Sequence, residues 1–160
     1  MVKERRFIVD VNVGKLAKWL RVMGYDAVFP PEAGDNELVR TALLEDRVLV
    51  TRDAEIARRR VVRMGQMTVI RIEDDNLRSQ LRQLVRDLGL NLNGGFSRCV
   101  CCNEPLHPIT KDDVAQLLPD YVLRSQSQFM QCASCRRVYW RGTHWSNMMS
   151  ELDRVYEEVP

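Results

Sequence analysis

Residues 6–29, RFIVDVNVGKLAKWLRVMGYDAVF, predict the fold of this chain because their hydrophobic pattern changes twice. Residues 6–9 are a short β-rich run, residues 13–23 carry apolar side chains at helical spacing, and residues 26–29 are a second β-rich run. Gly24 stands where the C′ residue of a helix belongs. A strand, a helix and a second strand in this order are typical of a parallel β-α-β unit.

The same alternation continues to about residue 89. Further helices are expected over residues 36–45, 54–62 and 76–88, and further strands over residues 48–51 and 68–72. Repeated strand–helix units predict an α/β domain with a parallel sheet, right-handed crossovers and helices on its faces. The pattern does not give the order of the strands in the sheet.

The composition changes after residues 91–95, Asn-Leu-Asn-Gly-Gly, which are typical of a turn-rich linker. We therefore expect an α/β domain over residues 1–92 and a small second module over residues 96–160. All five cysteines lie in this second part, and its only clear helical pattern covers about residues 147–158.

Composition excludes some classes of protein. The chain has 160 residues, of which 45% are hydrophobic and 29% charged, as in a globular protein in water. It has neither an apolar run of ~20 residues nor an apolar segment after its charged N-terminus, so we expect a cytoplasmic protein without a membrane partner. The net charge of +2 identifies no partner, although the arginine clusters at 58–60 and 136–137 are compatible with nucleic acid.

Two C-x₂-C pairs predict a structural zinc site. Cys99 and Cys102 form one pair, and Cys132 and Cys135 form the other. Four thiolates from two such pairs complete a closed tetrahedron, which leaves no position for a catalytic water. A redox dithiol needs only one pair, beside a thioredoxin-like pattern that this chain lacks. Cys101 is interpreted as a bystander.

Aromatic residues are frequent around the second cysteine pair. Phe129, Tyr139, Trp140 and Trp145 could form the core of the small module or stack on nucleic-acid bases, and core packing is the favoured interpretation for most of them. His144 could contact a phosphate, but packing near the zinc site is favoured.

Three aspartates follow or precede predicted elements at the same edge of the sheet. Asp10 follows the first strand, Asp35 precedes the second helix, and Asp53 follows the third strand. Each has a simple explanation as a helix cap or turn residue. Together they occupy the edge at which parallel sheets place their chemistry, and carboxylate oxygens suit Mg²⁺ or Mn²⁺. Metal-dependent attack on a phosphodiester is therefore the first hypothesis.

Other active sites fit the sequence less well. A haloacid-dehalogenase-type phosphatase requires Asp-x-Asp after the first strand, but Asn12 replaces the second acid. The segment 11–15 lacks the glycines of a Rossmann or Walker loop. A Ser-His-Asp hydrolase has little support, because both histidines lie in the cysteine-containing part.

Motifs along nearly the whole chain resemble one family. They are FIVD (7–10), GKLAKWLR (14–21), GYD (24–26), DNEL (35–38), LVTRD (49–53), RC (98–99), CN (102–103), PL (105–106), Cys132, Cys135, RVYW (137–140) and GTHW (142–145). In this order they are similar to the PIN-like ribonuclease family named for the C-terminal domain of the Mut-seven exonuclease. The resemblance implies a three-layer PIN-like domain followed by a zinc ribbon.

The resemblance also implies an activity, namely hydrolysis of single-stranded RNA by a ribonuclease that uses Mg²⁺ or Mn²⁺ at Asp10, Asp35 and Asp53. Asn36 stands where relatives often have a second acid, and Glu37 is the nearest candidate for a fourth catalytic acid. The alternative is a non-catalytic RNA-binding protein that retains the fold and the ribbon.

Basic residues near the predicted acids could hold the RNA backbone. Arg52 precedes Asp53, and Lys15 and Lys18 lie three residues apart on one face of the first helix. We expect these side chains to contact phosphates, although solvated lysines explain the same pattern. The sequence does not indicate the oligomeric state.

Overall fold

The computed structural model describes residues 3–160 and contains a four-stranded parallel sheet of order β2-β1-β3-β4. The strands are β1 (Arg6–Val9), β2 (Asp26–Val28), β3 (Val48–Thr51) and β4 (Val69–Arg71). Ile8 of the central strand β1 pairs with Val28 on one side and with Leu49 on the other. Each strand lies within a range predicted from the sequence.

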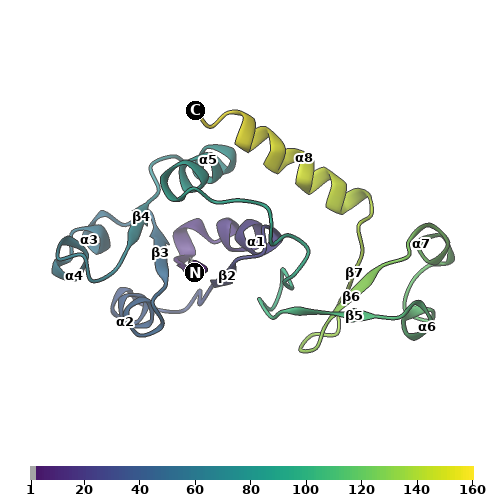
Figure 1. Cartoon of the computed structure of the whole chain (residues 1–160). Coiled ribbons are helices and arrows are strands. Elements are labelled where there is room, and N and C mark those ends of the chain that lie inside the picture. Colours follow the sequence, from purple (N-terminus) through teal and green to yellow (C-terminus); the bar gives the residue numbers. More distant parts are fainter. Residues whose placement is uncertain (1–2) are drawn as a thin grey trace.

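Helices cover both faces of this sheet, which gives three layers (Figure 1). Side chains alternate along β1, so that Phe7 and Val9 face one layer and Ile8 faces the other. The first layer contains α1 (Lys15–Val22) and α5 (Leu77–Leu88), and the second contains α2 (Asp35–Glu45), α3 (Ala54–Ala57) and α4 (Arg60–Arg63). The predicted α/β class is confirmed.

The predicted helix over residues 54–62 is interrupted. α3 ends at Ala57 and α4 begins at Arg60, because Arg59 adopts φ −59° and ψ 147°, which is not a helical conformation. The Arg59 guanidinium donates to Asn36 Oδ1 at 2.8 Å and so ties this break to the start of α2. Neither glycine nor proline occurs at the break, so the sequence pattern did not indicate it. The predicted helix 13–23 is observed as α1, which a 3₁₀ turn, η1 (Val11–Val13), precedes.

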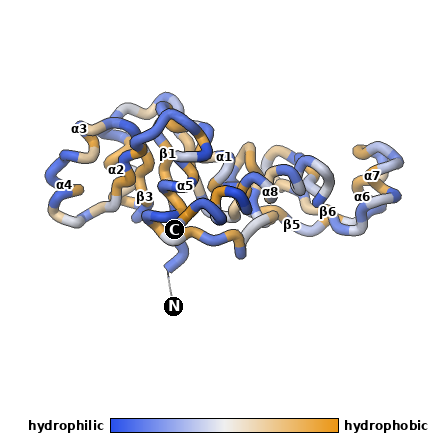
Figure 2. Tube along the Cα trace, turned by 90° about the horizontal axis from the view of Figure 1, so that it is seen from above, coloured by the Kyte–Doolittle hydropathy of each residue, from blue (hydrophilic) through white to orange (hydrophobic). Residues whose placement is uncertain are grey.

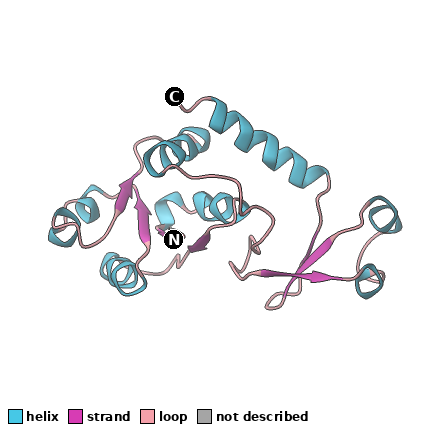
Figure 3. Ribbon diagram, in the orientation of Figure 1, coloured by secondary structure: helices cyan, strands magenta, loops and turns pink. Residues whose placement is uncertain are grey.

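The second part of the chain contains an antiparallel sheet of order β5-β6-β7. Its strands are β5 (Leu106–Ile109), β6 (Phe129–Cys132) and β7 (Val138–Tyr139), and the short helices α6 (Lys111–Val114) and α7 (Asp120–Ser125) lie between β5 and β6 in sequence. Figures 1 and 3 show α6 and α7 at the end of this sheet that is remote from the four-stranded sheet. This part is called the ribbon below.

The C-terminal helix α8 (Thr143–Glu157) returns to the first part (Figure 1). Met148, Leu152 and Val155 belong to the same core as the inner faces of α1 and α5. The Arg78 guanidinium on α5 donates to Glu151 at 2.8 Å. Figure 2 accordingly shows α8 between the layers of the large sheet and the ribbon. The division at residues 93–95 stays a prediction, but α8 packs on the first part.

None of the helices within residues 3–160 is long and apolar enough to cross a lipid bilayer.

The loop Cys99–Asn103 is docked on β2, the edge strand of the large sheet. The buried Arg21 donates from Nε to Ala27 O at 2.9 Å and from Nη1 to Val100 O at 2.9 Å. Asn103 Oδ1 in turn accepts the Ala27 N–H at 2.9 Å. The outer N–H of Ala27 is therefore occupied by the ribbon and its C=O by Arg21 of α1, rather than by another strand.

The connection between the two parts passes close to the end of α1. Gly24 has φ +96°, and a Cβ placed on it would lie 1.9 Å from the carbonyl oxygen of Gly94. Glycine is required here both by the left-handed backbone and by this approach.

The Asp26 carboxylate joins the docked loop to the sheet. It accepts the Asn103 side-chain N–H at 2.7 Å and the Arg47 guanidinium at 2.7 Å, while Arg47 also donates to Phe7 O at 3.1 Å. Burial raises the pKa of Asp26, but the hydrogen bonds from Arg47 and Asn103 outweigh burial and hold the pKa below its usual value.

We expect Asp26→Asn to destabilise the protein at neutral pH but much less in acid. A carboxyl whose folded-state pKa is lowered stabilises the fold above its unfolded pKa of about 3.9, and this contribution is lost as the pH falls through the folded pKa. Urea unfolding of wild type and variant between about pH 7 and pH 3 measures the difference. The exposed Asp112→Asn serves as control, and a difference that does not change with pH would contradict the assignment.

Candidate functional site

Asp10 and Asp53 are held at one edge of the sheet by Thr51. Because β1 and β3 are parallel neighbours, their carboxyl ends lie side by side. The fully buried Thr51 donates from Oγ1 to Asp10 Oδ2 at 2.7 Å, and the same oxygen accepts the Asp53 N–H at 3.0 Å. One hydroxyl group therefore fixes the position of Asp10 relative to the backbone of Asp53.

The carboxylates of Asp10 and Asp53 differ in how many of their oxygens accept a hydrogen bond. Asp10 is 6% exposed, and its second oxygen accepts the Val11 N–H at 2.8 Å, so that both oxygens accept a hydrogen bond. Asp53 caps α3, because its Oδ1 accepts the Glu55 N–H at 2.8 Å. Among the residues that the structure describes, no donor binds the other Asp53 oxygen. Asp10 is therefore fixed, whereas Asp53 keeps one oxygen for a ligand.

Asp35 starts α2 at the same edge of the sheet. The helix cap is Gly34, and Asp35 is the first helical residue, so the capping explanation does not hold for this aspartate. The hydrogen bond from Arg59 to Asn36 links the start of α2 to the segment that follows Asp53. Glu37 lies in the same first turn and is exposed. Asp10, Asp35 and Asp53 are called the acidic rim below.

The carboxylates of the acidic rim do not meet at one point. Within residues 3–160, only the four cysteines form a group of three or more Cys, His, Asp or Glu side chains whose ligand atoms all lie within 4.8 Å of one another. A metal ion at the rim would therefore be bound partly through water or after side-chain rotation.

The basic residues predicted to contact RNA are on α1, which follows Asp10 in the chain, and directly before Asp53. Lys15 and Lys18 are exposed on α1. Arg52 forms an ion pair with the exposed Asp75, and its backbone N–H donates to Asn12 Oδ1 at 3.2 Å. The lysines are therefore free to meet a phosphate, whereas Arg52 would have to leave Asp75.

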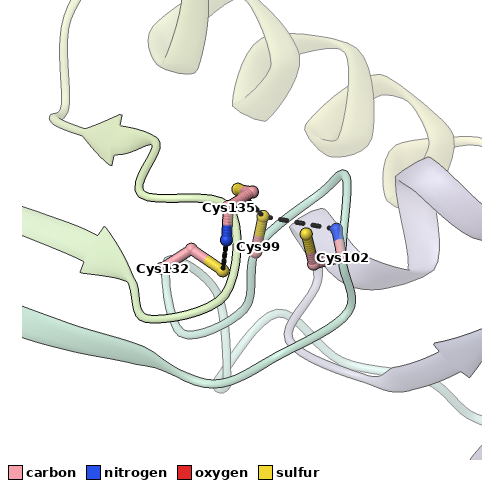
Figure 4. A group of neighbouring side chains, drawn as sticks. All are labelled: Cys99, Cys102, Cys132 and Cys135. Carbon is pink, nitrogen blue, oxygen red and sulfur yellow. Dashed lines mark hydrogen bonds between the residues drawn. The ribbon is translucent and has the colours of Figure 1, made fainter.

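The predicted zinc ligands converge. The four sulfur atoms of Cys99, Cys102, Cys132 and Cys135 lie within 4.8 Å of one another, and Cys99 Sγ is 3.6 Å from Cys135 Sγ (Figure 4). A tetrahedral ion with Zn–S bonds of ~2.3 Å separates its sulfurs by ~3.8 Å, so the cluster fits zinc. Cys101 is exposed and lies outside the cluster, as predicted.

The two cysteine pairs have the same local geometry. In each pair the N–H of the second cysteine points to the sulfur of the first, at 3.3 Å for Cys102 and 3.5 Å for Cys135. The residue that follows each pair is left-handed, with φ 67° at Asn103 and 66° at Arg136, and each donates its N–H to the carbonyl of the first cysteine at 2.9 Å. Two independent segments thus adopt one metal-binding knuckle conformation.

Tyr139 supports the cluster from β7, with its hydroxyl 3.0 Å from Cys99 Sγ. Burial raises the pKa of the Cys99 thiol, but hydrogen bonds from Tyr139 and from the backbone N–H groups of Cys102 and Cys101 outweigh burial and bring the pKa to about 7. The thiolate form that a metal requires therefore forms more readily at Cys99 than at an ordinary cysteine.

Sequence reasoning missed four residues that organise these sites. Thr51, Arg21, Asn103 and Tyr139 act through hydrogen bonds to segments distant in sequence. The only signal available for Thr51 was a hydroxyl at the end of the strand before Asp53. Nothing in the local pattern indicated Arg21 or Asn103, because each reads as an ordinary helix or loop residue.

Comparisons with known proteins give one match. The family model described as Mut7-C RNAse domain matches residues 5–152. No curated protein and no solved structure matches the chain.

We expect Thr51→Val to destabilise the protein by ~1.5–3 kcal/mol, the range for a hydrogen bond to a charged group. Valine has nearly the shape of threonine but leaves Asp10 Oδ2 without its buried donor. Urea unfolding at neutral pH measures the change. Thr51→Ser keeps the hydroxyl and should lose less stability than Thr51→Val. Equal losses of stability in the two variants would show that the methyl group of Thr51, and not its hydroxyl, stabilises the fold.

Proposed function

Because this chain belongs to the Mut7-C RNAse domain family, we propose that it is a metal-dependent ribonuclease that hydrolyses phosphodiester bonds of single-stranded RNA. The observation that carries the proposal is the Thr51 hydroxyl, which joins Asp10 to the backbone of Asp53 across two parallel strands. Burial of the Asp10 carboxylate costs desolvation, and the hydrogen bonds from Thr51 and Val11 offset this cost and hold the charge at the rim.

The acidic rim would hold Mg²⁺ or Mn²⁺. Such an ion activates water for in-line attack and neutralises charge on the phosphate. In this proposal Asp10 acts as the fixed ligand, while Asp53 and Asp35 contribute oxygens directly or through water. Glu37, one turn into α2, is the candidate for the fourth acid.

The RNA backbone would be held beside the rim by basic side chains. Lys15 and Lys18 are exposed on the helix that follows Asp10, and Arg52 directly precedes Asp53. Arg52 would exchange its exposed partner Asp75 for a phosphate, an exchange of small cost because exposed ion pairs contribute only ~0–1 kcal/mol.

A non-catalytic RNA-binding protein is the second candidate. It is favoured by one observation, namely that the rim carboxylates lie farther apart than the cysteine ligands do. The two candidates differ in turnover, not in RNA affinity, so cleavage separates them.

We expect the wild type to cleave an unstructured labelled RNA in Mn²⁺ and Asp53→Asn to cleave it ~100-fold more slowly or not at all. The loss of one metal-binding carboxylate removes several kcal/mol of transition-state stabilisation, and ~1.4 kcal/mol corresponds to a factor of ten. Initial rates on a gel measure the effect.

Asp87→Asn is the matched control, since it makes the same chemical change on α5 away from the rim. Cleavage that persists unchanged in Asp53→Asn would rule out the rim as the active site. A wild type that binds RNA but never cleaves it in Mg²⁺ or Mn²⁺ would support the non-catalytic candidate. A chromogenic phosphate ester tests the remaining class, a phosphatase on small substrates.

We also propose that the four-cysteine cluster holds one structural zinc ion. What supports this is the convergence of four sulfurs on two equivalent knuckles. With four protein ligands the ion has no open coordination position, so it would stabilise the ribbon rather than take part in catalysis.

We expect about one zinc per purified chain. Cys132→Ser should lose most of the zinc and unfold at a lower temperature, whereas Cys101→Ser, which changes the cysteine outside the cluster, should keep both. Elemental analysis and thermal unfolding measure the two properties. Equal zinc content in both variants would exclude the proposed ligand set.

A further inference from the structure

A cavity of ≈ 860 Å³ lies between the ribbon and the first part of the chain. Its walls come from α1, the first cysteine pair, β5 and β7, α7 and the start of α8. This is called the ribbon cavity. Its volume is near the upper end of the ~300–1,000 Å³ of typical small-ligand sites, which leaves room for more than one nucleotide.

The charged side chains in the largely apolar wall of the ribbon cavity are all cationic. Lys18, Arg98 and Arg137 line it, and none of its lining residues is an aspartate or glutamate. Lys18 and Arg137 are exposed, and within residues 3–160 neither is paired with a carboxylate. Uncompensated cations around a cavity without acids favour a polyanion as ligand.

The same wall presents aromatic rings. Tyr121 on α7 is 70% exposed although it lines the cavity, and Trp140 is half-buried. Gly142 allows the Trp140 indole to lie close to the backbone, since a Cβ there would be 2.8 Å from the indole nitrogen. Rings on which unpaired bases stack, combined with a cationic groove, are the features by which proteins bind single strands.

Two further aromatic rings of the lining pack against each other. Phe96 and Trp145 pack edge to face with ring centroids 5.1 Å apart, and the Arg141 guanidinium lies 4.9 Å from the Phe96 ring centre. Phe96 is buried, so its ring is part of the packing rather than a stacking platform. Trp145 packs against Phe96, and the Tyr139 hydroxyl contacts Cys99, so that Tyr121 and Trp140 are the lining rings without such a partner.

Helix α1 connects the ribbon cavity to the acidic rim. It follows Asp10 after the turn η1, and Lys15 and Lys18 lie on one of its faces, ~4.5 Å apart along the helix axis. Lys18 lines the cavity, whereas Lys15 is one turn nearer to Asp10. A strand that crosses α1 would thus meet two lysines between the two sites.

We propose that the ribbon cavity binds a short run of unpaired nucleotides of the RNA substrate, with bases stacked on Tyr121 and Trp140 and phosphates paired with Lys18 and Arg137. This inference rests on the proposed function, because the bound strand is the one that reaches the acidic rim. A hydrophobic peptide would fill the apolar wall but would leave the cations without partners, which is why RNA is favoured.

The test is binding of a fluorescein-labelled oligouridine, measured by fluorescence anisotropy without added divalent cation or chelator, in the Asp53→Asn background. Tyr121→Ala should raise Kd roughly 5- to 150-fold, the loss of one stacked base, whereas Tyr121→Phe should not change it. Leu117→Ala, which truncates another exposed apolar residue outside the cavity, is the matched control and should bind normally.

The cations are tested by salt dependence. Replacing Lys18 and Arg137 with glutamine should lower the slope of log Kd against log salt concentration by roughly 0.7 for each lost phosphate contact. Arg86→Gln on α5, outside the cavity, should leave the slope unchanged.

Unchanged oligouridine affinity in Tyr121→Ala, with the variant folded by thermal unfolding, overturns the inference. So does polyglutamate binding that depends on Tyr121 while oligouridine does not bind, because the cavity would then take an acidic peptide. Failure of the proposed ribonuclease function gives a distinguishable result. In that case the wild type would bind oligouridine through Tyr121 but would cleave no RNA in Mn²⁺.

Discussion

The carboxylate of Asp26 is the group on which the arrangement of the two parts depends. Its partners, Arg47 and Asn103, come from the start of β3 and from the first cysteine knuckle, and Arg47 also binds the backbone of β1. One half-buried acid therefore connects two strands of the large sheet to the ribbon. Because hydrogen bonds to a charged group in a partly dry site are stronger than those at the surface, this small network fixes the first knuckle on the sheet, in addition to the apolar contacts that α8 makes with the first part.

The fold of the first part could be predicted because burial there follows simple periods. Strand β1 is a continuous apolar run in which Phe7, Ile8 and Val9 are fully buried. Helix α5 has an apolar face along Leu81 and Leu84. In both elements the hydrophobic pattern of the sequence agrees with the burial in the structure. The ribbon could not be predicted in this way. Its strands have two to four residues, and its helices α6 and α7 have four and six residues and pack on a small core around Phe129, so that neither kind of element repeats a pattern for long enough to be recognised.

The candidate site, like the fold, could be predicted in part from the sequence. The acids of the rim and the four clustered cysteines follow from position and spacing, because strand ends and C-x₂-C pairs are local features. The groups that hold them in place are not local. Thr51 becomes a partner of Asp10 only when β3 lies beside β1, and Tyr139 reaches Cys99 only when β7 folds against the first knuckle. The family match then adds the class of reaction, which neither geometry nor spacing supplies.

The hydrogen bonds that join Asn103 and Arg21 to Ala27 affect how the chain interacts with other chains when the ribbon is unfolded. An edge strand with free N–H and C=O groups is a template for pairing with another chain. Two of the three residues of β2, Ala27 and Val28, carry no charge that would oppose such pairing. In this protein Asn103 of the first knuckle occupies the N–H of Ala27 at that edge, and Arg21 of α1 occupies its C=O. A chain whose first knuckle is disordered would therefore expose the Ala27 N–H of this edge strand to pairing with another chain, with Arg21 of α1 still on the carbonyl.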